Sequence, residues 1–454
     1  MSVVPIGSAL IALFLGAIGG GAVLFRARVG VSATAILVRA LLGLAMLAAL
    51  VVHPALGVAL AVIVALVTWQ GRSVPVTEDR APFGTSTGLA AILVASVAAL
   101  LRPPAPIFWD ESVWLSKARV ACEGGAVLME RALDPQSELV PRGYPVVAAV
   151  IEACLALRDD SLAALVGGGT ALVLSTFALF VLLLGREAQS SFEERATLVV
   201  LACTPLAWVH LRSVQLDLPV GLLVAALVLA IERADAGDRV GLPAAITAAL
   251  LLGIKDEGLV GALAVALALG TRGASSRARR AAWISFACLA ISVFAFRLRL
   301  SLAGSANDDH TLGALALGAL LPLLGDALRD ASDLQTWGMA PAIALAACLV
   351  VVRKGTAGRA RRVAAVLGLF ALALLGALVL GPPQVRDFAF EGTLLDRMGL
   401  ELLPTAALLI SRLVPEAPRT ESTVLRPRPD TETATGSDPA DSARARPCGA
   451  EVAR

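Results

Sequence analysis

The sequence predicts an all-α polytopic membrane protein. Of its 454 residues, 57% are hydrophobic and only 16% are charged, whereas a soluble globular protein is about 45–50% apolar. The mean hydropathy is +0.80. Apolar runs near the ~20 residues that a spanning helix needs recur along most of the chain. These observations favour one helical bundle over several soluble domains. A formal net charge of +2 predicts no nucleic-acid partner.

The cysteines do not form a recognisable ligand or disulfide pattern. The six are scattered, with four in or beside apolar runs and no C-x-x-C spacing. We interpret them as small apolar fillers and expect no metal centre built on them. The N-terminus lacks the basic region of a cleavable signal, so residues 5–25 are predicted to be a retained first helix.

Two purely basic connectors, 271–280 and 353–362, orient the helices. The positive-inside rule predicts that both are cytoplasmic. Counting from them gives about 13 transmembrane helices (range 11–14), near 5–25, 31–52, 55–70, 85–101, 161–184, 196–211, 217–231, 241–254, 258–270, 281–297, 338–352, 363–381 and 398–413. The count closes only if two short apolar pieces, 144–157 and 311–324, do not cross, which suits interfacial or re-entrant helices.

This topology predicts three regions. Residues 1–84 hold N-terminal transmembrane helices, residues 85–413 form the core, and residues 414–454 are a disordered cytoplasmic tail rich in Pro, Thr, Asp and Arg. The N-terminus is expected outside and the C-terminus inside. The first long loop, 102–143, is expected on the extracytoplasmic face of the cell inner (plasma) membrane, and to carry interfacial helices.

Charged residues near the apolar runs gather on that same face of the predicted topology. They are Asp110, Glu111, Lys117, Arg119, Arg142, His210, Arg212, Asp217, Lys255, Asp256, Glu257, Asp308, Asp309, His310, Asp396 and Arg397. Charges so close to hydrocarbon are costly and often functional. Ordinary structural explanations also exist: a helix start for Asp217, a polar turn for Lys255 to Glu257, and snorkelling for Arg397. The pair Asp110-Glu111 stands apart because tryptophans flank it, although interfacial tryptophans are themselves common.

The order of these motifs resembles the GT-C superfamily of membrane glycosyltransferases. It is similar to the branch with protein O-mannosyltransferases and bacterial enzymes that modify lipid A or envelope glycans. The matching pieces are Trp109-Asp110-Glu111 with Lys117-Ala118, Tyr144-Pro145, Asp217, Lys255-Asp256-Glu257-Gly258, and Asp396-Arg397 with Pro404. The resemblance runs from about residue 85 to residue 413. Arg142-Gly143 replaces the polar lead-in that relatives often have before the Tyr-Pro helix.

The resemblance implies a helical bundle with a long first extracytoplasmic loop, a sugar donor linked to polyprenyl phosphate, and an acidic base in that loop. Carried over, the base is Asp110, with Glu111 as partner or substitute. Trp109, Tyr144, Asp217 and Glu257 are further candidate site residues.

The chemistry requires a carboxylate that deprotonates the acceptor hydroxyl and cations that neutralise the departing phosphate. Asp110 would give single displacement with inversion, and partial burial would tune its proton affinity. Lys255, Arg397 and then Arg142 are the candidate donor-phosphate ligands. A divalent metal would suit oxygen ligands at Asp110 or Glu111, but nothing in the sequence requires one. No Gly-rich nucleotide loop is present. The expected partners are the lipid-linked donor, a glycan or glycolipid acceptor and membrane lipid.

Two other functions remain open. A transporter or flippase for a lipid-linked or anionic solute would place ionisable residues near the bilayer midplane. The clearest candidates there are Arg39 and Glu401. A non-catalytic scaffold would leave Asp110 and Glu111 as solvated loop charges.

Overall fold

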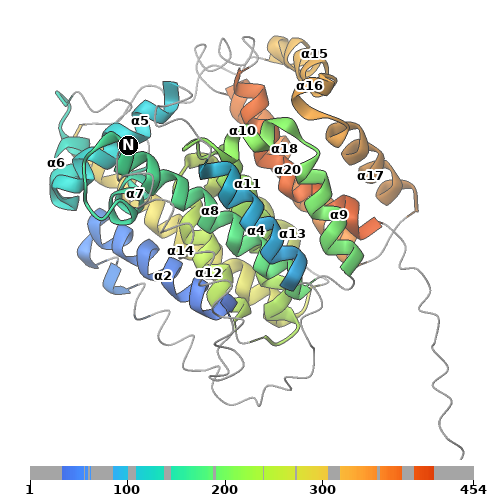
Figure 1. The fold of residues 1–454 in the computed structure, drawn as a ribbon, viewed down its shortest axis with the longest axis horizontal. Helices are drawn as coiled ribbons and strands as arrows, with labels where there is room; N and C mark the ends of the chain where they lie inside the picture. The colour runs from blue at the N-terminus through green and yellow to red at the C-terminus, as the bar shows by residue number, and fades with distance from the viewer. Residues whose placement is uncertain are drawn as a thin grey trace, which may run out of the picture. The chain divides into compact units, whose positions relative to one another are not determined.

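The described part of the chain is entirely helical, as the composition predicts (Figure 1). The computed structural model describes residues 33–55, 57–59, 62, 85–100, 109–137, 145–187, 191–238, 240–270, 274–304, 317–354, 358–380 and 393–413. No strand occurs among them. Predicted features at 5–25, at most of 55–70, at 307–310 and in the tail 414–454 lie outside these residues.

The helices follow one another with short connections. They are α2 (Ala33–Val52), α4 (Thr85–Leu100), α5 (Trp109–Glu123), α6 (Gly125–Leu133), α7 (Val147–Leu155), α8 (Leu162–Glu187), α9 (Ser191–Ala202), α10 (Pro205–Leu211), α11 (Asp217–Asp235), α12 (Gly241–Leu252), α13 (Asp256–Gly270), α14 (Ser276–Leu302), α15 (Leu320–Ala331), α16 (Leu334–Trp337), α17 (Ala340–Lys354), α18 (Arg359–Leu380) and α20 (Thr393–Leu413).

Four of the described helices are long and apolar enough to cross a membrane: Thr34–Val52, Leu162–Gly185, Ser276–Leu302 and Arg359–Leu380. Shorter apolar helices accompany them. The prediction of about 13 spans is therefore not confirmed. The short piece at 144–157 does form a short helix: α7 has nine residues, about 14 Å at 1.5 Å per residue, which is too short to cross.

Two boundaries differ from the prediction for local reasons. The continuous helix expected at 196–211 is two helices, because Pro205 starts α10 and Thr204 before it is extended. The residue before a proline disfavours helical backbone. The last helix begins at Thr393, five residues before the predicted start, so Asp396 and Arg397 lie in its first turns.

Helices α11 and α20 are parallel neighbours, and ion pairs join them at both ends. Near the start of each helix, Arg397 contacts Asp217. Near the other end, Arg412 contacts Glu232. At 1.5 Å per residue, the two ionic layers lie about 22 Å apart along each axis. We name these the Lys255 end, after the lysine that also binds Asp217, and the Arg412 end.

Successive helices run between these two ends. Asp256 starts α13 at the Lys255 end, and Arg297 near the end of α14 returns to bind it. Between them, Ser275 hydrogen bonds to Asp235 at the Arg412 end. Arg359 starts α18 against Glu232. Both basic connectors, 271–280 and 353–362, therefore adjoin the Arg412 end.

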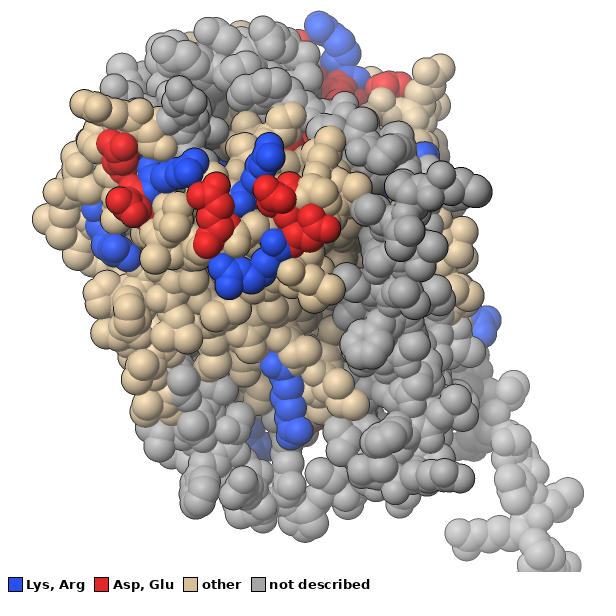
Figure 2. Space-filling view, turned by 60° about the vertical axis from the view of Figure 1, so that its left-hand side comes forward, with Lys and Arg blue, Asp and Glu red and all other residues tan. Residues whose placement is uncertain are grey.

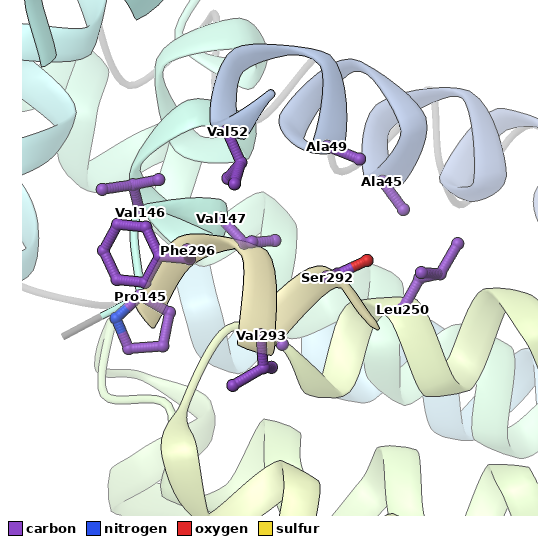
Figure 3. A pocket seen from close by; sticks show the side chains of 11 residues that line it. Ala45, Ala49, Val52, Pro145, Val146, Val147, Leu250, Ser292, Val293 and Phe296 are labelled. Carbon is purple, nitrogen blue, oxygen red and sulfur yellow. The ribbon is translucent and has the colours of Figure 1, made fainter. Parts of the chain in front are cut away.

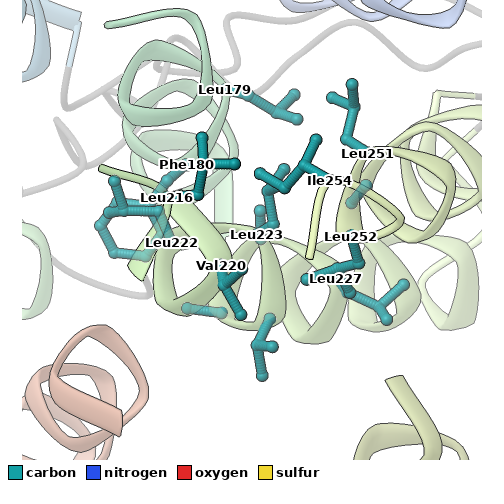
Figure 4. Close-up of a cluster of buried hydrophobic side chains, with 14 of the residues drawn as sticks. Leu179, Phe180, Leu216, Val220, Leu222, Leu223, Leu227, Leu251, Leu252 and Ile254 are labelled. Carbon is teal, nitrogen blue, oxygen red and sulfur yellow. The ribbon is translucent and has the colours of Figure 1, made fainter. Parts of the chain in front are cut away.

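The core packs around α11, which is buried along nearly its whole length. Figure 4 shows leucines of α11 against Leu179 and Phe180 of α8 and Leu251 and Leu252 of α12. In a membrane, side-chain packing and close helix approach stabilise such contacts, because lipid is as apolar as leucine. This buried helix holds Asp217 in a fixed position at the Lys255 end.

Gly221 lets α11 and α20 approach closely, and we expect Gly221→Ala to destabilise the protein. An added Cβ would lie 2.6 Å from the carbonyl oxygen of Glu401 and 2.8 Å from that of Leu400. Backbone atoms cannot rotate away, so the helices must separate, at a cost of about 1–3 kcal/mol. Melting of the purified protein in detergent measures the change.

Gly376→Ala is the matched control for that substitution. Gly376 lies inside α18 with nothing within 4 Å of an added Cβ. Alanine is the better helix former, so this variant should melt at the wild-type temperature or above it. Equal melting of Gly221→Ala and Gly376→Ala would show that the close approach of α11 and α20 is unimportant.

Candidate functional site

A buried ion cluster occupies the Lys255 end of the bundle. The ammonium Nζ of Lys255 lies 2.6 Å from Oδ1 of Asp217, 2.7 Å from Oε1 of Glu401 and 3.2 Å from Oε1 of Glu257. Arg397 Nε donates to the same oxygen of Asp217 at 3.1 Å. We call these five residues the Lys255 cluster: Asp217, Lys255, Glu257, Arg397 and Glu401. It has one more carboxylate than it has cations.

Lys255 stays charged in these surroundings. Burial alone lowers the pKa of Lys255, but the nearby carboxylates of Asp217, Glu257 and Glu401 outweigh it and hold the pKa well above its usual value. The lysine is 3% exposed. A buried ammonium with three carboxylate partners is a fixed internal charge, because removing its proton would leave the carboxylates uncompensated.

Local sequence explains how the cluster assembles. Asp217 is the first residue of α11, where a negative charge interacts favourably with the helix dipole. Lys255 lies in the short corner between α12 and α13. Arg397 and Glu401 are four residues apart on α20 and so share one face. The cluster thus joins α11, α13 and α20 at a single point.

The helix α5 attaches to the same end through Glu111. This residue is 0% exposed, and its Oε1 accepts a hydrogen bond of 2.6 Å from the backbone N–H of Val214. Val214 belongs to the turn that leads into α11 at Asp217. The start of α5 is therefore tied to the segment that positions Asp217.

A second charged group lies beside the Lys255 cluster. Arg297 of α14 binds Asp256 of α13 at 2.6 Å, and both side chains are about a quarter exposed. Lys117 of α5 is buried and interacts electrostatically with both. Its Nζ lies 5.9 Å from the ring centroid of Trp114, within cation–π range. We call Lys117, Asp256 and Arg297 the Lys117 group.

The structure brings together most of the residues that the sequence predicts. Glu111, Asp217, Lys255, Glu257 and Arg397 all lie at the Lys255 end. The backbone of Trp109 and Asp110 forms the start of α5, whereas their side chains lie outside the described part. Arg142 and Tyr144 also lie outside it.

Two predicted roles fit the geometry poorly. The three N–H groups of Lys255 face three carboxylates, which disfavours it as a ligand of the donor phosphate. Buried Glu111 accepts a backbone N–H, which favours a positioning role over that of a substitute base. Arg397 is 23% exposed and better placed to meet a ligand.

Sequence reasoning did not include Glu401, Lys117, Asp256 or Arg297 among the site residues. Glu401 carried a usable signal, because an acid four residues after Arg397 shares its helix face. It had been assigned instead to the midspan. Arg297 gave no such signal, because a cation at a helix end is ordinary in membrane proteins.

The surface near this end is rich in charge of both signs. Figure 2 shows acidic and basic side chains gathered across the upper part of one face, above a broad uncharged region. Exposed pairs such as Arg119–Asp160 and Arg131–Glu123 belong to the same short-helix region. Within the described residues, no group of three or more His, Cys, Asp or Glu side chains is suited to hold a metal ion.

Comparison with known proteins gave no relative: no family model matches the chain, and neither does any curated protein or solved structure.

Proposed function

We propose that the protein is an integral-membrane glycosyltransferase of the GT-C type. It moves a sugar from a polyprenyl-phosphate-linked donor to an extracytoplasmic glycan or lipid acceptor. The active site lies at the Lys255 end, under the short helices α5, α6 and α7. The complete bundle has about 13 spans, of which the helices described above are part.

One observation supports this proposal most. Residues of five separate sequence motifs, chosen by their resemblance to that superfamily, meet at a single end of the bundle when the chain folds. Glu111, Asp217, Lys255, Glu257 and Arg397 are up to 286 positions apart in the sequence, counted from Glu111 to Arg397. Unrelated polar turns would have no reason to converge on one buried cluster.

The orientation of the bundle fits an extracytoplasmic site. Both basic connectors adjoin the opposite, Arg412 end, and such connectors are retained in the cytoplasm. Lipid-linked sugars are used on the other face, where the proposed site lies.

The reaction needs few protein groups. Asp110 accepts the proton of the acceptor hydroxyl as its oxygen bonds to the anomeric carbon. The bond from that carbon to the phosphate oxygen breaks on the opposite side, and polyprenyl phosphate leaves with one more negative charge. Arg397 opposes that charge at the cluster, and Lys255 keeps Asp217 and Arg397 in place. Glu111 fixes the start of α5, which carries Asp110.

A transporter or flippase is the weaker alternative. Transport predicts ionisable groups along a path through the midplane. In α11, no charged residue occurs from Leu218 to Ile231, and in α20 none occurs from Leu402 to Ile410. The charges of both helices lie instead in the two layers at their ends. Glu401 belongs to the Lys255 layer through its contact with Lys255.

Reconstitution tests the proposal directly. Liposomes containing the purified protein would receive a panel of polyprenyl-phosphate sugars labelled in the sugar, together with envelope lipid extract as acceptor. We expect the label to appear in a new glycolipid or glycan, identified by mass spectrometry. Movement of labelled donor between leaflets without a new product would instead establish the flippase. Neither transfer nor movement with any donor would refute both functions.

A further inference from the structure

The donor phosphate requires a binding site other than the Lys255 ammonium. Within the Lys255 cluster, three carboxylates face two cations, so the cluster as a whole repels an anion when all five groups are charged. The neighbouring Lys117 group has the opposite balance, with two cations and one carboxylate. An approaching phosphate would therefore be attracted to the second group.

We propose that Lys117 and Arg297 form the anion-binding site for the phosphate of a lipid carrier, with Asp256 holding Arg297 in position. The inference rests on the proposed function and names new residues for it. Arg297 is 30% exposed, so its guanidinium can meet a ligand while it still binds Asp256. A guanidinium can grip two phosphate oxygens at once.

Apolar surface lies directly beside this group, where the chain of a lipid phosphate would lie. A pocket between α2, α7, α12 and α14 is lined by Ala49, Val147, Leu250, Val293 and Phe296, among others (Figure 3). Val293 is one helical turn before Arg297, so the two side chains share a face of α14. The space is small, about 20 Å³, enough for roughly one water-sized group.

A larger hollow adjoins the same end of α14. It measures about 510 Å³ and is lined by Leu50, Val51, Met129 and Leu133, with Arg299 and Glu130 as its charged residues. Ligand pockets commonly have volumes of ~300–1,000 Å³. Apolar walls of α2 and α6 next to Arg297 suit a hydrocarbon chain with an anionic head, which free phosphate lacks.

The site should couple anion binding to proton uptake. Burial lowers the pKa of Lys117 to about 7, partly opposed by Asp256 and reinforced by Arg297. The charged groups on Lys117's own helix and on the helices near it are Glu111, Arg119, Glu130, Arg131, Glu152, Asp256 and Arg297. A bound phosphate stabilises the ammonium form. As the pH rises above 7, Lys117 must take up a proton when the anion binds, so affinity should fall by up to about tenfold per pH unit.

Binding of polyprenyl monophosphate in detergent micelles tests this site. Three probes separate the sources of the signal: polyprenyl monophosphate, inorganic phosphate and uncharged polyprenol. We expect the first to bind wild type more tightly at pH 6 than at pH 8.5, with the other two much weaker. Arg297→Gln should raise the dissociation constant about tenfold or more, because it removes a charge-assisted hydrogen bond. Lys117→Gln should weaken binding and abolish its pH dependence.

Controls keep the outcomes separate. Arg119→Gln removes an exposed cation on the same helix, 67% exposed and paired with Asp160, and should bind as wild type does. If Lys117→Gln fails to fold, Arg297→Gln still tests the site. Normal binding by Arg297→Gln would overturn the inference and leave the enzyme intact. Tight binding of inorganic phosphate alone would also overturn it. Absence of carrier binding by wild type would instead refute the proposed function.

Discussion

Lys255→Met should be among the most destabilising substitutions in this protein. Lys255 is 3% exposed and bridges Asp217, Glu257 and Glu401, which come from three helices. Methionine fills similar space but leaves these carboxylates without their shared cation. Removing one partner of a buried ion pair costs about 3–5 kcal/mol. The purified variant should melt at a clearly lower temperature in detergent.

A second substitution tests the electrostatic origin of that loss. Lys255→Met combined with Glu401→Gln removes one of the uncompensated charges and should recover part of the stability, because Arg397 still balances Asp217. Arg131→Met is the control: its pair with Glu123 is half exposed, and such pairs contribute about 0–1 kcal/mol. Should Lys255→Met melt together with Arg131→Met, the Lys255 cluster would not hold the helices together.

Asp110→Asn should abolish most sugar transfer without unfolding the protein. If Asp110 is the general base, asparagine cannot accept the proton of the acceptor hydroxyl. General-base catalysis contributes about 10²–10⁴-fold to the rate, so transfer in the liposome assay should fall by a factor in this range. Glycolipids and glycans of cells that carry only this variant should resemble those of a deletion strain by mass spectrometry.

Asp160→Asn is the matched control for Asp110→Asn. Asp160 is 64% exposed and follows α7 in the same short-helix region, so the substitution removes the same chemical group away from the proposed base. It should retain transfer. Equal melting of both variants would show that lost activity is not lost folding. Full transfer by Asp110→Asn would eliminate Asp110 as the base and would move attention to the carboxylates of the Lys255 cluster.

Composition predicted the fold class because apolar content decides it. A chain with 57% hydrophobic residues cannot expose them all to water, and in lipid a helix satisfies its own backbone hydrogen bonds. The helix starts at Asp217 and Asp256 were also readable, because acids are favourable there. Span number was less accessible, since several helices that run between the two ends are short: α12 has only twelve residues.

Site residues were predicted unevenly, and the reason is geometric. Asp217, Lys255 and Arg397 stood out as charges next to apolar runs, and they do meet. Their partners were harder to foresee. The roles of Glu401 and Arg297 depend on which helices pack side by side, and that cannot be read from spacing within one helix. Lys255 looked like a free cation in the sequence because its partners lie 38 and 146 positions away.

The sequence by itself determined an all-helical, membrane-type chain with its ionisable residues beside the apolar runs. Only the tertiary structure decided how these charges are shared. The parallel packing of α11 and α20 encloses Lys255 among carboxylates, and the return of α14 leaves Lys117 and Arg297 with a single acid. The physical reason is that the charge balance of a buried site depends on distances between helices, which no local pattern encodes.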